Sequence, residues 1–401
     1  MSNSLLTIDM ITRKALEILE NNLVITRNVN RQYDDSFAVE GAKIGSTLRI
    51  RLPDRALVTD GAALQTQDDN EQYTTLTVAS QKHIGINFTS AELTMLLDDF
   101  AERVLKPRVS QLAASIDADV ANAFQSIYQS VGTPGTTPST SLVLLQAQQK
   151  LNEAAAVMSP RYATVNPAAN AGLVEGMKGL FNPTDTISKQ FKNGLMGTGV
   201  LGLEEINMSQ SIKQHLTGSW GSAITVGTTV STQGQSTLDI SFTGSSKTWN
   251  VGDVFTISGV YSVNPQTRQS TGSLQQFVVT QATSGSSTAT LSISPAIYTS
   301  TQALATVDAF PISGATVTML GSAATQYAQN LVYHKDAITF ATADLLLPQG
   351  VDMASRQVHN GISMRIVRQY DINNDRMPCR IDVLYGYSVI RPQMAVRMWG
   401  A

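Results

Sequence analysis

The sequence has little cysteine, no long hydrophobic run and no secretory signal. One cysteine among 401 residues, Cys379, excludes an internal disulfide and a metal site built from cysteine alone. The first 25 residues mix apolar and charged residues in the pattern of an amphipathic helix, and no run of about 18 apolar residues follows. We therefore expect no membrane partner, and we expect Cys379 to be buried as a small apolar side chain.

The sequence also lacks a surplus of positive charge. Its net charge is -3 and its pI is near 5.8, which excludes a strong basic field for gripping nucleic acid. Any contact with DNA should be local, weak and without sequence preference. With 42% hydrophobic residues, the chain can bury a substantial core and should divide into two or three domains.

Catalytic motifs are missing as well. The four histidines have no spacing typical of a metal site, and no Gly-x-Ser-x-Gly, phosphate-loop or His-Glu-x-x-His motif is present. Residues 197–202 imitate a glycine-rich dinucleotide loop, but no buried strand precedes them and a strand-like run follows, which favours a flexible loop entering a strand. Residues 371–375 imitate a calcium loop, yet Arg376 replaces the required glycine, so a hairpin turn is expected. We predict no catalytic residue, metal or cofactor.

A long amphipathic helix is predicted from Pro107 to Tyr128. Apolar residues recur in it at three- and four-residue spacing, and proline suits its first turn. The opposite, polar face includes Asp117 and Asp119 and carries no recognisable catalytic set. The predicted core residues of this spine helix are Val109, Leu112, Ile116, Val120, Phe124 and Ile127.

Residues 41–88 predict a long two-stranded projection, the ribbon. Apolar residues alternate with Arg49 and Arg51 in its first half, and they occupy even positions between Tyr73 and Phe88 in its second half. A lone ribbon is marginally stable in water, so it should lie against a neighbouring subunit, or else pack on its own domain as an ordinary hairpin. Its charged residues are the candidate inter-subunit contacts, which would set register more than strength: Arg49, Arg51, Arg55, Asp54, Asp60, Asp68, Asp69 and Glu71.

The composition changes sharply over residues 218–325, where only five residues are charged. Six short runs with two-residue alternation are separated by turn-rich links, which predicts a small all-β barrel or sandwich with Trp249 in its core. This region should fold as an autonomous insert. Around it, helices over 107–128 and 142–158, a strand over 161–165, and a hairpin over 364–387 favour an α+β body.

Three runs of residues resemble the major capsid (coat) proteins of short-tailed bacteriophages, the gene-5-type coat family. They are Ile44 to Pro53, Lys82 to Thr94 continuing to Pro107, and Asp382 to Gly386. The resemblance implies the tailed-phage major capsid fold: a long spine helix, an extended β-hairpin loop lying over a neighbour, a central sheet and an inserted β-barrel domain. It implies no enzymatic activity.

The predicted division has four parts: an N-terminal arm and helix over 1–40, the extended hairpin loop over 41–88, a capsid core over 89–217 and 326–401, and the inserted barrel over 218–325. The expected function is self-assembly, as hexamers and pentamers, into the icosahedral shell of a tailed phage around double-stranded DNA. Scaffolding protein and a portal are expected partners, the virion capsid is the expected location, and assembly is expected in the host bacterial cytoplasm.

Two other functions stay open at this point. One is a phage surface or tail protein whose β insert binds host carbohydrate. The other is an α/β nucleotide enzyme that uses the loop at Gly197. Particle morphology would separate the first from a capsid protein, and nucleotide binding would test the second.

Overall fold

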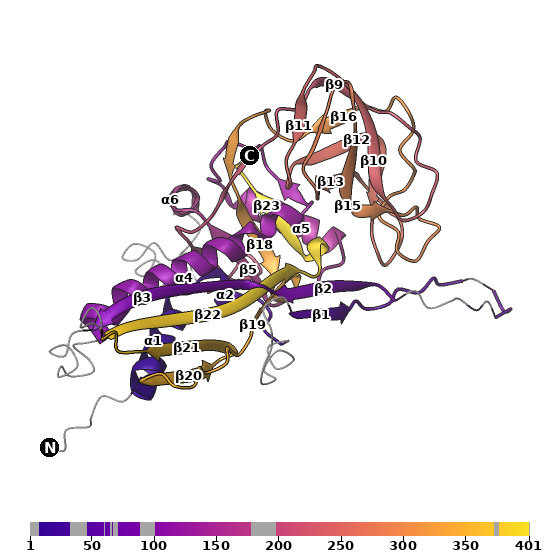
Figure 1. The fold of residues 1–401 in the computed structure, drawn as a ribbon. Helices are drawn as coiled ribbons and strands as arrows, with labels where there is room; N and C mark the ends of the chain where they lie inside the picture. The colour runs from indigo at the N-terminus through magenta and orange to yellow at the C-terminus, as the bar shows by residue number, and fades with distance from the viewer. Residues whose placement is uncertain are drawn as a thin grey trace. The chain divides into compact units, whose positions relative to one another are not determined.

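The computed structural model describes residues 8–32, 46–59, 61–64, 66, 71–88, 101–177, 198–372 and 377–400. Two compact units are present (Figure 1). Unit 1 comprises Met1–Ile50, Tyr73–Ala121 and Ile338–Ile390, and unit 2 comprises Arg51–Gln72, Asn122–Ala337 and Arg391–Ala401. Each unit contains both helices and sheets, so the predicted α+β class is confirmed.

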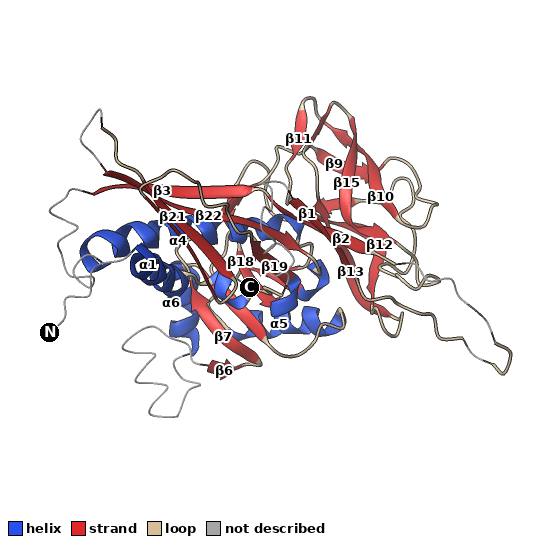
Figure 2. Cartoon of the chain, turned by 60° about the horizontal axis from the view of Figure 1, so that its bottom comes forward, coloured by secondary structure: helices blue, strands red, loops and turns tan. Residues whose placement is uncertain are grey.

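Unit 1 is built on an antiparallel sheet with helices packed against it (Figure 2). Helix α1 contacts strands β20 and β21, helix α4 contacts β3, and the two helices contact each other. The strand order is β19 (Ile338–Thr342), β22 (Met377–Val389), β21 (Ile362–Arg368) and β20 (Met353–His359), and β3 (Ser80–Phe88) also pairs with β22. The helices are α1 (Ile8–Asn22), the short α2 (Ile25–Asn28) and α4 (Lys106–Ala121).

The predicted spine helix is present, with ends that differ from the prediction. Helix α4 ends at Ala121 and continues as the 3-10 turn η4 (Asn122–Ser126), while a π-helical turn, η3 (Ala101–Leu105), precedes it. Pro107 has no amide proton to donate, so the regular bonding ladder cannot run through it, and the preceding turn has the wider π form. All six predicted core residues are buried: Val109, Leu112, Ile116, Val120, Phe124 and Ile127.

The predicted ribbon is shorter than expected, because its second half joins another sheet. Strand β1 (Ser46–Arg51) pairs with β2 (Tyr73–Val78), but β3 pairs with β22 along its whole length. The prediction of one long projection over 41–88 was therefore wrong, since the partner of β3 lies almost 300 residues away and no local pattern reveals it. Leu76 and Val78 are fully buried, and β2 packs against β22 within unit 1.

Unit 2 contains a six-stranded mixed sheet. Strands β5 and β7 run parallel, while β18 is antiparallel to β5 and β23. The order is β4 (Ser130–Val131), β23 (Ala395–Met398), β18 (Asn330–His334), β5 (Arg161–Val165), β7 (Leu203–Met208) and β6 (Thr198–Val200). Helix α5 (Ser141–Glu153) packs on β23, and α6 (Pro167–Met177) packs on α5. Two single 3-10 turns, η5 (Lys335–Ala337) and η6 (Pro392–Met394), complete this part.

Helix α5 ends before the predicted boundary at Met158. The amide of Ala156 donates to the carbonyl of Leu151, and that of Ala155 donates to Asn152, which together close a Schellman cap. Ala155 takes the left-handed φ of 53° that this cap requires. Because glycine is the usual residue at this position, the alanine gave no stop signal in the sequence.

The region over 218–325 is an all-β barrel, as its alternation predicted. Its sheet has the order β16 (Val317–Met319), β12 (Val254–Val263), β13 (Ser270–Val279), β15 (Thr288–Ile297), β10 (Gln235–Thr243) and β9 (Ser222–Val226). A bridge between Thr225 and Thr316 joins the two outer strands, so the sheet closes on itself. A smaller pair, β11 (Lys247–Trp249) and β14 (Thr283–Gly285), lies beside it.

The barrel interior contains Trp249, which is fully buried as predicted. Phe242 meets its ring edge to face at 4.7 Å between centroids, and Phe255 stacks on Phe277 at 5.7 Å. Such aromatic pairs add about 1 kcal/mol each beyond the area that they bury. The barrel therefore has its own hydrophobic core.

The sequence also predicts a short helix that begins after Ser90 and carries Asp98 and Asp99 on a solvated face, and this helix lies outside the described residues. Residues 373–376 of the calcium-like loop and its flank lie outside them as well. Where the structure is described, no helix combines the length and the apolar character needed to cross a bilayer. Cys379 is buried as predicted, and burial raises the pKa of its thiol to about 12.

Candidate functional site

The charged residues of the ribbon differ in their contacts and in their exposure to solvent. Arg51 Nη1 lies 3.1 Å from Glu71 Oε1 of the same chain, and both side chains are more than half exposed. The Arg49 guanidinium lies 4.1 Å above the Tyr73 ring, where the negative face of the ring attracts it. Asp54 is exposed. Of the remaining candidates, Asp60, Asp68 and Asp69 lie outside the described residues.

Arg55 occupies a more enclosed position than the other ribbon charges. It is half-buried and lines a cavity of 330 Å³ together with Tyr298 and Arg391. Among the described members of the predicted set, Arg51 and Glu71 are the two that the structure brings together. That contact lies within one chain, whereas the pairing predicted from the sequence is between subunits and stays a prediction.

The described part of the ribbon exposes large apolar side chains. Val58 is 81% exposed, Leu64 is 89% exposed and Tyr73 is 54% exposed. Single exposed apolar residues are normal on a protein surface, but three on one narrow segment favour a contact with another molecule. This is the surface at which we expect a partner.

Asp117 is buried, although it was assigned from the sequence to the polar face opposite the apolar stripe. Its carboxylate accepts hydrogen bonds from the amides of Val24 at 2.6 Å and Thr26 at 3.0 Å, and from the Thr26 hydroxyl at 2.6 Å. Burial raises the pKa of Asp117, and these hydrogen bonds oppose the rise. The spacing Ala113, Asp117, Val120 already places this residue on the buried stripe, so its polar character misled the prediction. Asp117 ties the short helix α2 to the spine helix.

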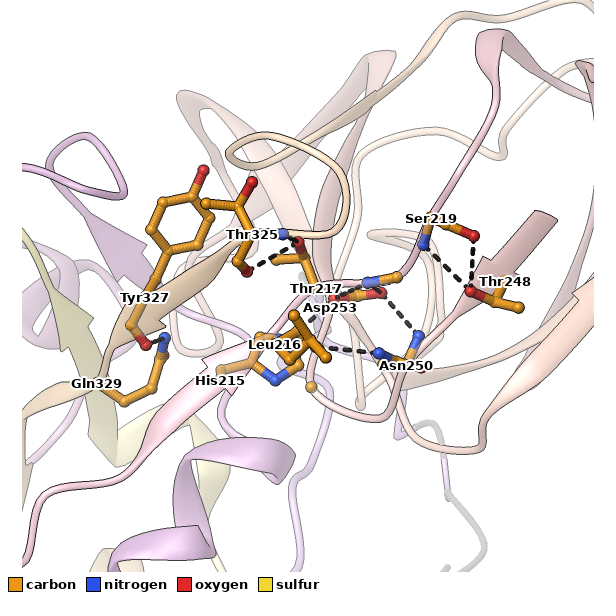
Figure 3. A network of polar contacts seen from close by, with 12 residues as sticks. His215, Leu216, Thr217, Ser219, Thr248, Asn250, Asp253, Thr325, Tyr327 and Gln329 are labelled. Atoms are coloured by element: carbon orange, nitrogen blue, oxygen red, sulfur yellow. Dashed lines mark hydrogen bonds and ion pairs between the residues drawn. The ribbon is translucent and has the colours of Figure 1, made fainter.

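A polar network lies where the chain enters and leaves the barrel (Figure 3). The incoming strand β8 (Gln214–Leu216) pairs with the outgoing strand β17 (Gln326–Ala328), so the predicted insert over 218–325 lies between two paired strands. Across the same junction, the Thr217 amide donates to the Thr325 carbonyl at 3.0 Å. The Thr217 hydroxyl donates to the Ser322 carbonyl at 2.7 Å.

Asp253 is the centre of this network (Figure 3). Its carboxylate lies 2.8 Å from His215 Nε2 and accepts hydrogen bonds from the amides of Asn250 at 2.7 Å and Gly218 at 3.1 Å. The Asp253 side chain is 0% exposed and that of His215 is 8% exposed. One carboxylate therefore fixes the incoming strand, the first residue of the insert and the turn before β12.

A buried cation lies on the other side of this junction. Arg397 on β23 donates to the Gly252 carbonyl at 2.7 Å, and its guanidinium lies 5.3 Å from the Phe124 ring centroid. Burial lowers the pKa of Arg397 to about 9, and the charge of Asp253 opposes this shift. Phe124 also meets the His215 ring edge to face at 5.5 Å. The arrangement joins parts of the chain more than 270 residues apart, and the side chains of Asp253, His215 and Arg397 are all buried in it.

The sequence features that suggested chemistry have structural roles. Thr198–Val200 is a strand, and Leu201 and Gly202 form a positive-φ turn between it and β7, so the loop is a tight β-hairpin where a flexible loop was expected. His83 and His359 are exposed, while His215 and His334 are buried. Over the described ranges, no cluster of three or more His, Cys, Asp or Glu residues could hold a metal ion.

The comparison with known protein families decides the identity. Residues 1–400 match the family described as "P22 coat protein - gene protein 5". The chain belongs to this coat protein family. It is therefore a phage major capsid protein, a structural component of the virion shell with the tailed-phage capsid fold. This family membership favours the capsid prediction over a carbohydrate-binding tail protein or a nucleotide enzyme.

Three individual relatives have low sequence identity to this coat protein, between 12% and 31%. The major capsid protein of Acyrthosiphon pisum secondary endosymbiont phage 1 is 22% identical over 336 residues, which is 79% of each chain. A solved structure from Mycobacterium phage Che8 is 12% identical, covers 94% of this chain and 90% of that one, and has a TM-score of 0.47. The CUS-3 coat protein I-domain is 31% identical over 26% of this chain and 99% of that one, with a TM-score of 0.20.

Sequence reasoning missed the buried groups that hold this coat protein together. Asp253 and His215 are 38 residues apart, and their contact depends on the barrel folding back on its own stem. One signal was available for Asp253: it is one of five charged residues in the insert, and it ends a tight turn before an apolar strand. A charge in such surroundings is expected to be paired.

Proposed function

We propose that hexamers and pentamers of this coat protein build an icosahedral precursor shell in the host bacterial cytoplasm. A scaffolding protein directs the assembly, and a portal occupies one vertex. Double-stranded DNA is then packaged inside. The net charge of -3 supports only weak contact between the inner surface and DNA, without sequence preference.

The exposed apolar side chains of the ribbon are the observation that carries this proposal. Val58 and Leu64 are largely exposed, and burying such side chains against a neighbour contributes about 1.5 to 3 kcal/mol each. A shell needs many contacts of this modest size, because subunits placed wrongly must be able to dissociate before the shell closes.

Each part of the predicted division has a proposed role. The arm over 1–40 provides contacts, and so does the ribbon, which is limited to β1, β2 and the residues between them. The core over 89–217 and 326–401 holds these elements on the spine helix, and the barrel over 218–325 folds as an autonomous insert. The closed sheet and separate hydrophobic core of the barrel support the last point.

Electron microscopy of the expressed chain tests the proposal. Co-expression with the scaffolding protein of the same phage should give closed shells, and the chain alone should give shells, capsomers or aberrant particles. A chain that stays monomeric in both preparations contradicts the proposal.

We also propose that the ribbon charges Arg49, Arg51, Arg55, Asp54, Asp60, Asp68, Asp69 and Glu71 include pairs formed between subunits. Exchanging the two charges of the Arg51–Glu71 pair distinguishes pairing between subunits from pairing within one chain. Arg51→Glu alone should lower the unfolding free energy of the subunit by about 0 to 1 kcal/mol, and adding Glu71→Arg should restore it. If neighbours also contribute, the exchanged double variant still assembles more slowly and with a changed salt dependence. Wild-type kinetics for the double variant would contradict pairing between subunits at these positions.

A further inference from the structure

Strand β20 is an outer strand of the unit 1 sheet, and its free edge is open. It pairs with β21 from Met353 to His359 without interruption, and within the described part of the chain no strand pairs with its other side. Met353 and Val358 are exposed on it. A strand edge of this length is a template for another strand.

The turn that joins β20 to β21 determines which backbone groups point outward. Asn360 and Gly361 both have positive φ, and His359 lies opposite Ile362, which is a two-residue type I′ hairpin. Such a turn is closed by a hydrogen-bonded pair, and bonded pairs then alternate along the strands. The amides and carbonyls of Ala354, Arg356 and Val358 therefore point away from β21. No backbone hydrogen bond to another described segment occupies them.

This edge has few of the features that block strand addition. It contains no proline and no bulge, and its one charged side chain, Arg356, is held by Asp344 at 3.5 Å. Soluble monomers normally protect an exposed edge with unpaired charge, proline or a bulge. The absence of such protection here favours a strand partner in the assembled state.

Strand β1 of the ribbon offers a matching edge. The Leu52 amide donates to the Gln72 carbonyl at 2.8 Å, and the hydroxyls of Thr47 and Thr77 lie 3.1 Å apart, so β1 and β2 are antiparallel. Hydrogen-bonded and non-bonded pairs alternate along antiparallel strands, and Leu52 belongs to a bonded pair. The backbone amides and carbonyls of Arg49 and Arg51 therefore point away from β2.

The two edges are also similar in length. Strand β1 has six residues and β20 has seven.

We propose that β1 of a second copy of this chain adds to the free edge of β20 and extends the unit 1 sheet across a subunit boundary. Backbone hydrogen bonds provide the contact, as in other strand-addition complexes. Since β20 and β1 are different edges, each copy donates one and accepts at the other. Such a heterologous contact continues from subunit to subunit until a ring closes. This inference rests on the proposed self-assembly.

Proline substitution tests the proposal, because proline removes one amide without changing charge at position 358. Val358→Pro leaves the bonds to β21 intact and should keep the subunit folded, whereas it removes an outward donor and blocks the approach of a strand. Assembly of purified subunits, followed by light scattering, should slow by about tenfold or more. Arg49→Pro should have the same effect from the other edge. Val358→Ala is the matched control for Val358→Pro and should assemble within about threefold of wild type. Arg49→Ala removes the same charge as Arg49→Pro, so it is the reference for that variant, and Arg49→Pro should assemble about tenfold more slowly than Arg49→Ala.

Each outcome decides a separate point. Wild-type assembly rates for folded Val358→Pro or Arg49→Pro subunits overturn the proposed edge pairing. A wild-type chain that forms no particles overturns the proposed function instead. If a proline variant does not fold, hydrogen exchange on the wild-type chain replaces it. The amides of Ala354, Arg356 and Val358 should become protected only in shells, and unchanged exchange at all three overturns the proposal.

Discussion

Replacing Asp253 with alanine should destabilise the coat protein by about 3 to 5 kcal/mol, a large share of the stability of a typical domain. The change leaves the buried amides of Asn250 and Gly218 without their acceptor and separates His215 from its partner. It also removes the negative charge that favours the protonated form of the buried Arg397. Urea unfolding, followed by circular dichroism, measures the loss.

Asp239 provides the matched control in the same barrel. It is exposed on β10, and its carboxylate accepts a hydrogen bond from the Thr290 hydroxyl at 2.7 Å. Asp239→Ala should cost no more than about 1 kcal/mol. Asp253→Asn, which keeps one acceptor oxygen, should fall between the two. Equal losses for Asp253→Ala and Asp239→Ala would contradict the central role of Asp253 at the junction.

Replacing Gly386 with alanine should cost about 3 kcal/mol, because β22 and β2 approach too closely for any side chain there. A Cβ atom at Gly386 would lie 2.1 Å from the Thr77 carbonyl oxygen and 2.9 Å from the Val78 Cα. Both are backbone atoms of β2, so the base of the ribbon would have to move away from the sheet. Thermal and urea unfolding of the purified subunit measure the effect.

The control for Gly386 is Gly85, a glycine on the neighbouring strand β3. A Cβ atom at Gly85 would meet nothing within 4 Å. Gly85→Ala should leave stability unchanged or raise it by about 0.5 kcal/mol, because the unfolded chain loses freedom. If both variants unfold at the same urea concentration, β2 does not depend on close packing at Gly386.

The spacing of apolar residues was sufficient to predict the elements in which buried residues recur at one regular interval. The alternation of Leu238, Ile240 and Phe242 identified a barrel strand, and all three are buried. The three- and four-residue spacing from Val109 to Ile127 identified the buried stripe of the spine helix. Neither pattern needs information from another part of the chain.

Elements and contacts that depend on distant partners were not predictable in this way. Strand β20 contains serine, arginine, glutamine and histidine without clear alternation, and it forms because β21 and a tight turn hold it. Strand β3 alternates well, but its partner β22 could not be inferred from spacing. The polarity of Asp117 concealed its burial, since its hydrogen-bond donors come from residues more than 90 positions earlier.

Hydrogen exchange along the ribbon tests the central claim of self-assembly through a neighbour most directly. Peptides covering residues 46–59 and 71–78 should be compared between unassembled subunits and shells, with β12 of the barrel core as an internal reference. We predict that exchange in the ribbon peptides slows by about tenfold or more in shells, while the reference stays slow in both states. Equal exchange of the ribbon in both states would contradict the claim that it lies against a neighbouring subunit.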